Sequence, residues 1–437
     1  MNPKAEEIKG QIFDLIKHYH DEIYTRNAFI PGESNIPVSG KVFDERELQL
    51  MTEAALDGVF TTGRFNTEFE KRLAKYIGVN NLITVNSGSS ANLVAAATLT
   101  AEELGERALK AGDEFITVSV SFPTTINPLL MYGLVPVFLD VEIPSYEIDV
   151  SKIEEAIGPK TKAIVIAHTL GNTFQVEEVS RIAKKHNLWL IEDCCDALGA
   201  TYNNKHVGTF GDIATISFYP AHHITMGEGG AVFTTNWRLK KIMESFRDWG
   251  RDCYCEPGKD NTCKKRFGWQ LGNLPFGYDH KYTYSRLGYN LKITDMQAAL
   301  GLAQLEKLDE FIRIRRHNFN RLKEGLAGLS DKLILPVATP NSNPSWFGFL
   351  ITLKDDAGIT RNDLITELNA RKIATRLLFA GNIIHQPYFK NYPYRVVGEL
   401  KNADIVMNQT FWIGVTPMID DEMIDYVVDS FHQILKA

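Results

Sequence analysis

The chain has 437 residues, a hydrophobic content of 44% and a formal net charge of −7 at pH 7. This length suits one large domain and one smaller domain, and the acidic balance gives no general case for nucleic-acid binding. The longest apolar run, LLMYGLVPVFL, is too short and proline-broken to span a bilayer, and the N-terminal stretch lacks the apolar core of a signal peptide. We therefore expect a cytoplasmic protein with neither a nucleic-acid nor a membrane partner.

The N-terminal residues 1–50 predict a helix followed by an extended, proline-containing segment. From residue 51 onward, short runs rich in Val and Ile alternate with helical patterns such as residues 176–187. This alternation is typical of an α/β fold with a mostly parallel central sheet and helices on both faces. The predicted strands span residues 82–86, 114–120, 135–141, 162–169, 188–193, 213–219 and 231–235.

Residues 250–287, called the insertion below, interrupt this alternation with an aperiodic segment rich in glycine, cysteine, aromatic and basic residues. A structureless segment of this length is usually functional or disordered, and its cysteines favour a function. A long helix follows, for which Thr294 is the predicted N-cap. We assign residues 51–320 to a large α/β domain that carries the insertion. Residues 321–437 predict a smaller α+β domain with strands at 346–354 and 374–379 and helices at 360–372 and 420–436.

A turn between two predicted strands gathers polar residues. Ser217 and Tyr219 end one strand, Pro220 and two histidines follow, and the segment GEGG leads into the next strand. Open α/β sheets place their active sites at the carboxyl ends of strands. No lysine occurs between Lys205 and Lys240, so this turn offers no amine that could hold an aldehyde cofactor covalently.

Three further features lie at predicted strand ends. The segment NSGSSAN at residues 86–92 opens a helix with small residues, which suits an anion bound by backbone N–H groups; a serine-capped helix start is the alternative. Phe122 follows another strand and either covers a planar cofactor or packs in the core. Asp193 is either a cap or surface acid, or a carboxylate that keeps a pyridine nitrogen protonated.

The segments NSGSSAN, VSFPTT, LIEDCCDALGA, VGTFGDIATISFYP and GEGGAVFTT occur in this order over about residues 50–320. Together they resemble the nucleotide-sugar aminotransferase family of the fold-type I pyridoxal-phosphate enzymes. The resemblance implies a homodimer that binds pyridoxal or pyridoxamine phosphate. It also implies a set of cofactor contacts: Gly88, Ser89, Ser90 and Ser217 at the phosphate, Phe122 against the ring, Asp193 at the ring nitrogen, and Asn290 reaching a phosphate in the neighbouring subunit.

The chain departs from that family at the expected reaction centre. The family carries its cofactor-binding lysine in the turn after Ser217, and alignment on Pro220 and GEGG places His222 there. Tyr219 and Asp196 are altered as well. Pyridoxamine phosphate can still be held without the lysine, and an imidazole can act as a base near neutral pH. We therefore predict that His222 removes a proton from C4′ of the cofactor while the C3 hydroxyl of a 4-ketohexose leaves.

The sequence leaves two alternatives to this prediction. His223 is the rival base, and a decayed aminotransferase in which His222 merely packs would be catalytically inactive. The predicted catalytic residues are His222, Asp193, Tyr219 and Asp196. The residues predicted to contact the substrate are Phe347, Arg376 and His385.

The cysteines of the chain are Cys194, Cys195, Cys253, Cys255 and Cys263. Fifty-seven residues separate Cys195 from Cys253, one separates Cys253 from Cys255, and seven separate Cys255 from Cys263. Four thiolates suit a [2Fe–2S] cluster, whereas structural zinc usually uses wider Cys pairs; free cysteines are a third possibility. Strand alternation would place Cys195 on the side of Asp193 and turn Cys194 towards the core, so Cys195 is the predicted fourth ligand.

His222, the cysteine spacing and the insertion together resemble the lysine-less, iron–sulfur 3-dehydrases of this family, which act on CDP-4-keto-6-deoxy-D-glucose in 3,6-dideoxyhexose and lipopolysaccharide biosynthesis. The resemblance implies pyridoxamine phosphate, a [2Fe–2S] cluster and a separate NADH-dependent iron–sulfur flavoprotein reductase. The basic residues that either dock this reductase or belong to a solvated loop are Lys259, Lys264, Lys265 and Arg266. A cluster-free dehydratase that renews its amine from glutamate is the main rival.

Overall fold

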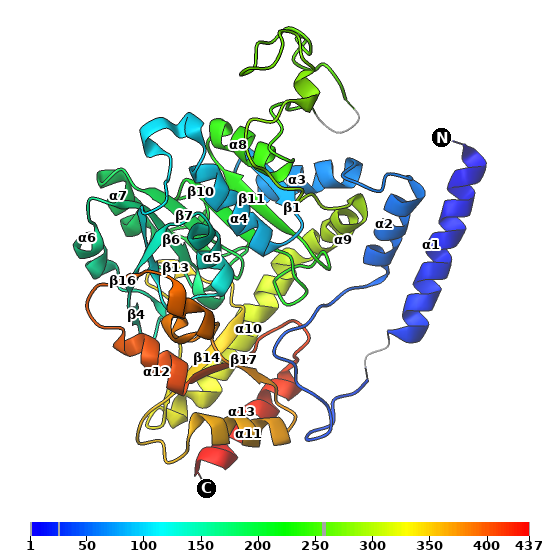
Figure 1. The fold of residues 1–437 in the computed structure, drawn as a ribbon. Helices are drawn as coiled ribbons and strands as arrows, with labels where there is room; N and C mark the ends of the chain where they lie inside the picture. Colours follow the sequence, from blue (N-terminus) through cyan, green and yellow to red (C-terminus); the bar gives the residue numbers. More distant parts are fainter. Residues whose placement is uncertain (1, 25–26, 256–258, 437) are drawn as a thin grey trace.

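A central sheet organises the chain in the computed structural model, which describes residues 2–24, 27–255 and 259–436 (Figure 1). Its strand order is β1-β11-β10-β7-β6-β2-β3-β16, and among these described strands only β11 runs antiparallel to its neighbours. The strands are β1 (Asn81–Val85), β2 (Glu114–Val118), β3 (Val135–Leu139), β6 (Thr161–Ala167), β7 (Trp189–Asp193), β10 (Ile213–Ser217), β11 (Gly230–Thr234) and β16 (Arg395–Val396). The mostly parallel sheet predicted from the sequence is confirmed.

Helices cover both faces of this sheet, as predicted (Figure 1). One face packs against α4 (Gly88–Leu99), α5 (Pro123–Met131), α7 (Val176–Lys185) and α8 (Trp237–Arg247). The other face packs against α2 (Glu45–Leu56), α3 (Arg64–Ile77), α9 (Asp295–Leu305) and the start of α10 (Leu308–Leu326). Shorter elements at the edges are β4 (Val141–Glu142), β5 (Glu147–Ile148), α6 (Ile153–Ala156), β8 (Thr201–Tyr202), β9 (Lys205–His206) and β13 (Ser342–Asn343).

The long helix predicted after Thr294 is two helices. Thr294 caps α9 in a capping box with Gln297, as its position predicted. The chain then bends at Glu306 and Lys307, and α10 begins at Leu308. The bend lets α9 cover the large sheet while α10 runs on into the smaller domain (Figure 1).

The smaller domain is built on an antiparallel sheet of order β12-β14-β17-β15. Its elements are β12 (Leu333–Ile334), β14 (Gly348–Leu353), α11 (Arg361–Ala370), β15 (Thr375–Arg376), α12 (Lys401–Gln409), β17 (Thr410–Gly414) and α13 (Asp421–Lys436). The interior strand β17 and helix α12 were not predicted. Strand β16 also differs from expectation, because it leaves this domain and pairs with β3 at the edge of the large sheet.

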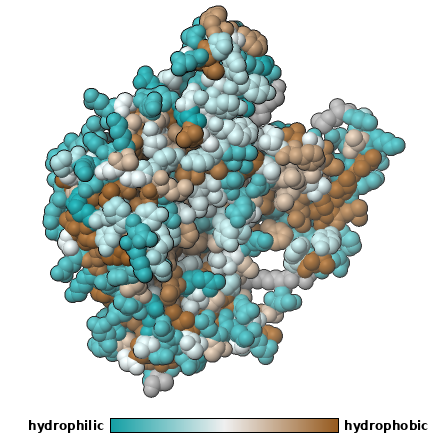
Figure 2. Space-filling view, in the orientation of Figure 1, coloured by the Kyte–Doolittle hydropathy of each residue, from teal (hydrophilic) through white to brown (hydrophobic). Residues whose placement is uncertain are grey.

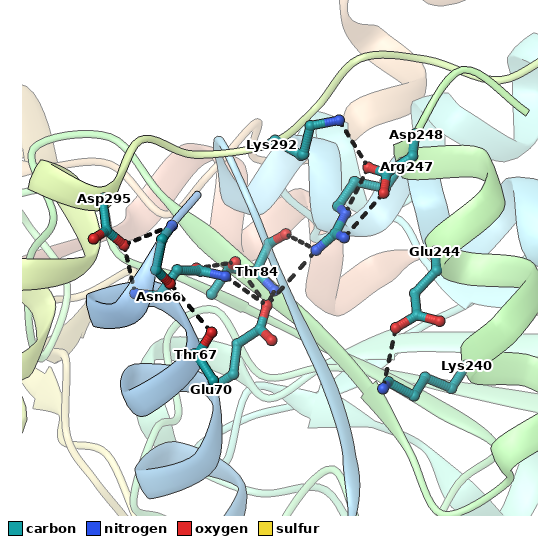
Figure 3. Close-up of polar contacts among 11 residues, drawn as sticks. Asn66, Thr67, Glu70, Thr84, Lys240, Glu244, Arg247, Asp248, Lys292 and Asp295 are labelled. Atoms are coloured by element: carbon teal, nitrogen blue, oxygen red, sulfur yellow. Dashed lines mark hydrogen bonds and ion pairs between the residues drawn. The ribbon is translucent and has the colours of Figure 1, made fainter. Parts of the chain in front are cut away.

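A polar network ties α3, α8 and α9 together beneath the insertion (Figure 3). The carboxylate of Asp295 accepts hydrogen bonds from the backbone N–H groups of Gly63, Phe65 and Asn66, and so caps α3 from another helix. Arg247 at the end of α8 bonds the carboxylate of Asp248 through two nitrogens. This network stabilises the part of the large domain from which the insertion projects.

Two segments stand apart from the two cores. The insertion projects from the large domain as irregular chain with one short 3₁₀ turn, His280–Tyr282, among its described residues; residues 256–258 lie outside them (Figure 1). Helix α1 (Pro3–Ile23) has no buried residue, and Figure 2 shows the hydrophobic surface that it presents. None of the described helices combines the length and the apolar character that crossing a membrane requires.

Candidate active site

A cavity of about 490 Å³ opens where β7 and β10 end, beside the N-terminus of α4. This is the position at which open α/β sheets bind their ligands. The predicted residues that line it are Gly88, Ser89, Phe122, Asp193, Cys195, Asp196, Ser217, Tyr219, His222, Phe347 and Arg376. Residues from six separate regions of the sequence thus meet in one cavity.

The N-terminus of α4 lies directly against the end of β10. A Cβ atom on Gly88 would lie 2.4 Å from Cβ and 2.8 Å from Oγ of Ser217, so only glycine permits this approach. The first amides of a helix have no intrahelical acceptor and favour an anion in front of them. Ser89 and Ser217 line the cavity at the same place. The arrangement fits a phosphate group.

Two predicted phosphate contacts have other positions. Ser90 donates its hydroxyl to the side chain of Asn86 at 2.6 Å, and its backbone N–H is capped by Ser87. Ser90 therefore supports the turn rather than lining the cavity. Asn290 is exposed, pairs with Asp248 through a backbone bridge and lies outside this cavity. Its predicted contact concerns a second subunit and stays a prediction.

Asp193 is held rigidly at the floor of the cavity, where it is 4% exposed. Its Oδ2 accepts hydrogen bonds from Asn92 at 2.9 Å and from Thr125 at 2.7 Å, and its Oδ1 accepts one from the backbone of Cys195. Thr215 donates to the amide oxygen of Asn92 and so fixes which end of the amide faces the carboxylate. Asp193 is thus a buried, oriented carboxylate, suited to meeting a protonated ring nitrogen.

Phe122 stands at the start of α5, half exposed, with its ring 6.2 Å from that of Phe379. Both rings line the cavity. A core position for Phe122, which the sequence left open, is therefore excluded. The exposed face of an aromatic ring here suits stacking on a planar ligand.

The structure separates the two histidines of the turn. His222 lines the cavity, with its Nδ1 atom 3.3 Å from Oδ1 of Asp196 and its ring 5.2 Å from that of Phe347. Nδ1 and the Asp196 carboxylate do not meet in hydrogen-bond geometry, so this is a close contact only. His223 is 3% exposed and donates from Nε2 to the carbonyl of Ser345 at 2.8 Å. Burial lowers the pKa of His223 well below its usual value, and this histidine does not line the cavity.

Of the residues predicted to contact the substrate, two line the cavity and one does not. Phe347 and Arg376 line the cavity, as does the half-exposed Tyr219. His385 does not line it; this histidine is exposed and its Nε2 lies 3.4 Å from Asp404. The residues beside it pack against the large domain, where Ile383 and Phe389 belong to the core.

Several cavity residues could not be singled out from the sequence, among them His168 and Trp412. His168 is fully buried, stacks on Phe174 with ring centroids 4.3 Å apart, and contacts Glu192 at 3.2 Å. Glu192 also accepts three backbone hydrogen bonds from the loop at residues 208–211. With its carboxylate so occupied, this pair anchors the loop and is not a free metal site. The sequence does not reveal this pair, because His168 and Glu192 come together only when β6 and β7 lie side by side.

The described structure does not assemble the predicted four-cysteine set. Cys195 lines the catalytic cavity, where burial raises the pKa of its thiol well above the usual value. Cys253, Cys255 and Cys263 line a separate small cavity within the insertion, next to His280. Cys195 lies apart from the other three: its strand end faces the catalytic cavity, whereas the insertion projects away from the body (Figure 1), and its role as the fourth ligand stays a prediction. The alternation argument is otherwise confirmed, because Cys194 is buried in the core at 1% exposure.

The sheet, the cavity and its residues define an enzyme fold of the fold-type I pyridoxal-phosphate class. Residues 41–432 match the model of the DegT/DnrJ/EryC1/StrS aminotransferase family, and the chain belongs to this family.

Individual relatives cover the chain almost end to end. The lipopolysaccharide biosynthesis protein RfbH of Salmonella typhimurium is 63% identical over 98% of both chains. A dTDP-4-dehydro-2,6-dideoxy-D-glucose 3-dehydratase of Saccharopolyspora spinosa is 53% identical over 98% of this chain and 92% of its own length. Among solved structures, an Escherichia coli GDP-4-keto-6-deoxy-D-mannose-3-dehydratase with bound hydrated PLP is 32% identical, with a TM-score of 0.81 over 91% of this chain and 99% of its own.

Proposed function

We propose that the chain is a pyridoxamine-phosphate-dependent dehydrase that removes the C3 hydroxyl of a nucleotide-linked 4-keto-6-deoxyhexose in deoxysugar biosynthesis. The observation that carries the proposal is the placement of His222. It faces the cavity formed by the phosphate cradle and Asp193, and none of the described residues lining that cavity is a lysine. A cofactor site of this family without lysine favours elimination over amino transfer, because the cofactor cannot be held or released through a protein amine.

Several residues of the cavity have a role in this proposal. Gly88, Ser89 and Ser217 hold the cofactor phosphate, Asp193 holds the ring nitrogen in its protonated form, and Phe122 covers the ring. Bound pyridoxamine phosphate supplies an amine for the C4 ketone and a path for electrons between C4′ and C3.

His222 is the base that accepts the proton from C4′, and Asp196 faces its other ring nitrogen. With pyridoxamine phosphate bound, the electron pair released by this proton transfer would be available to expel the C3 hydroxyl, which would leave as water after gaining a proton. Because His222 lines the cavity, it can return that proton to the C3 hydroxyl. Phe347 packs against the imidazole and limits its rotation.

For the nucleotide we propose CDP, with CDP-4-keto-6-deoxy-D-glucose as substrate. Support comes from the sequence resemblance and from the 63% identity to a lipopolysaccharide biosynthesis protein. The names of other relatives mention dTDP and GDP sugars. A competition assay with the CDP, dTDP and GDP forms of the same 4-keto-6-deoxyhexose tests this choice. CDP should give the highest kcat/KM, and preference for another nucleotide would refute it.

We further propose that the insertion carries a redox centre, a [2Fe–2S] cluster, fed by an NADH-dependent iron–sulfur flavoprotein reductase. Three of its proposed ligands, Cys253, Cys255 and Cys263, share one cavity. Hydrogen bonds from Thr262 and from His280 lower the pKa values of Cys255 and Cys263, respectively, which favours thiolates. Cys195 can complete the set only if the insertion folds back over the catalytic cavity.

The surface of the insertion supports a protein partner. It carries seven basic and four acidic residues in a chain of net charge −7. Its exposed aromatic side chains include Phe267, Phe276, Tyr282 and Tyr284. Aromatic residues and arginine are enriched at protein interfaces, and the excess of positive charge would attract an acidic partner. We propose this face as the docking site of the reductase and place the homodimer contact at the exposed Asn290.

A second candidate is a cluster-free dehydratase that renews its amine from glutamate. The separation of Cys195 from the other cysteines favours it, as does the likeness to a GDP-sugar 3-dehydratase structure that holds a PLP–glutamate adduct. An anaerobic assay with CDP-4-keto-6-deoxyglucose, NADH and reductase, with iron analysis on the same sample, separates the two. The first proposal predicts bound iron and a 3-deoxy product that requires NADH; turnover driven by glutamate without iron would establish the second.

A further inference from the structure

Helix α10 places a charged side chain, Arg315, behind the wall of the catalytic cavity. Arg315 is 1% exposed, and no carboxylate lies within ion-pair distance of it among the described residues. Burial lowers its pKa to about 10, so it remains charged at neutral pH. A buried, unpaired cation costs several kcal/mol in desolvation. Its presence in a core helix therefore calls for a function.

The guanidinium group spans two segments that form the cavity wall. It donates to the backbone carbonyl of His222 at 3.4 Å and to those of Trp346 and Phe347 at 3.4 and 3.3 Å. The rings of His222 and Phe347 meet on the cavity side of these carbonyls, 5.2 Å apart. The guanidinium group thus links the backbone of His222 to the backbone of Phe347, whose ring packs on the imidazole.

The same charge also acts on Asp196, the carboxylate that faces His222. Asp196 is the acidic group that stabilises charged Arg315. Asp196 in turn lies 3.3 Å from the Nδ1 atom of His222, so the charge of Arg315 acts on the carboxylate that faces the base.

We propose that Arg315 is the positioning residue of the catalytic base: it fixes the turn of His222 against Phe347 so that the imidazole is held over the cofactor position. The proposal rests on the function proposed above, in which His222 moves the C4′ proton. Base geometry matters because a displacement of about 1 Å can reduce a rate by about a hundredfold.

The adjacent residue, Arg316, provides a matched control. It leaves the same helix and binds the same stretch of chain, donating to the carbonyls of Pro344 at 2.7 Å and Asn343 at 3.2 Å. It makes no hydrogen bond to His222 and does not line the cavity. Loss of Arg316 should therefore disturb packing between the helix and residues 343–344 without moving the base.

The test compares Arg315→Lys and Arg315→Gln with Arg316→Lys and Arg316→Gln. Deuterium exchange at C4′ of bound pyridoxamine phosphate is measured with CDP-, dTDP- and GDP-4-keto-6-deoxyglucose, together with cofactor affinity and melting temperature. Either Arg315 variant that folds should exchange about tenfold to a hundredfold more slowly at saturating cofactor and substrate, with near-normal cofactor affinity. The Arg316 variants should exchange at the wild-type rate. Wild-type exchange in a folded Arg315 variant would overturn the inference.

A double variant shows whether Arg315 acts through His222. In a His222→Asn background, adding Arg315→Gln should not slow the residual exchange further, because the group being positioned is already gone. An equal additional loss would show a purely structural role and contradict the proposal. Failure of the proposed function is distinct, because the wild-type protein itself would then show no exchange with any of the three substrates.

Discussion

Nδ1 of His222 lies 3.3 Å from Oδ1 of Asp196, and both side chains face the catalytic cavity. Because Asp196 occupies the side of Nδ1, the other ring nitrogen is the one left for a substrate or cofactor proton. Asp196→Asn should therefore slow C4′ exchange by about tenfold to a hundredfold while leaving cofactor affinity unchanged. Exchange is followed by deuterium incorporation, with cofactor affinity measured on the same protein. An unaffected rate would show that Asp196 does not orient the base.

Gly88→Ala tests the phosphate cradle. The new Cβ would lie 2.4 Å from Cβ of Ser217 and 3.1 Å from Sγ of Cys195, so the helix N-terminus must move away from the phosphate position. Cofactor affinity should fall about tenfold or more, as measured by absorbance titration with pyridoxamine phosphate. Gly10→Ala is the control, since nothing lies within 4 Å of a Cβ there. Equal affinity in both variants would refute the proposed phosphate-binding role of this helix N-terminus.

Asp193→Asn tests the ring-nitrogen role. The replacement keeps the shape but removes the negative charge, and an amide group would face the donors Asn92 and Thr125. Cofactor retention and turnover should both fall, retention by about tenfold. Retention is measured after gel filtration and turnover in the reductase-coupled assay. Full activity in this variant would end the proposed role.

Cys253→Ser tests the redox centre. Iron should drop to background, while dehydration stays detectable through exchange of solvent oxygen into the C3 position, because His222 and Asp193 lie in a separate cavity. Metal analysis and mass spectrometry provide the two readouts. Unchanged iron would refute Cys253 as a ligand. The companion variant Cys195→Ser loses iron only if the insertion folds back over the catalytic cavity.

Much of the large domain followed from local sequence. Runs such as residues 162–169 are apolar because both sides of a central parallel strand are buried, and this pattern locates the strands. Thr294 and Gln297 form the capping box because side chains at that spacing reach each other's backbone. His222 could be located because Pro220 and GEGG bracket the turn.

Other features depend on contacts between segments far apart in the chain. Asn92 and Thr125, which hold Asp193, come from two helices, and nothing local marks them as its partners. The two-residue strand β16 forms only because β3 offers a free edge. In the sequence Arg315 cannot be told from an exposed charged residue of a helix, because its burial depends on the smaller domain packing against α10. The position of Cys195 away from the insertion likewise depends on the path of the whole insertion.

The proposed function depends on His222 acting as a base where the family has a lysine. The most direct measurement is deuterium exchange at C4′ of bound pyridoxamine phosphate, with CDP-4-keto-6-deoxyglucose, in the wild-type protein and in His222→Asn. We predict exchange in the wild type and a loss of at least about a hundredfold in the variant, with cofactor binding retained. Undiminished exchange in a cofactor-loaded His222→Asn protein would contradict it.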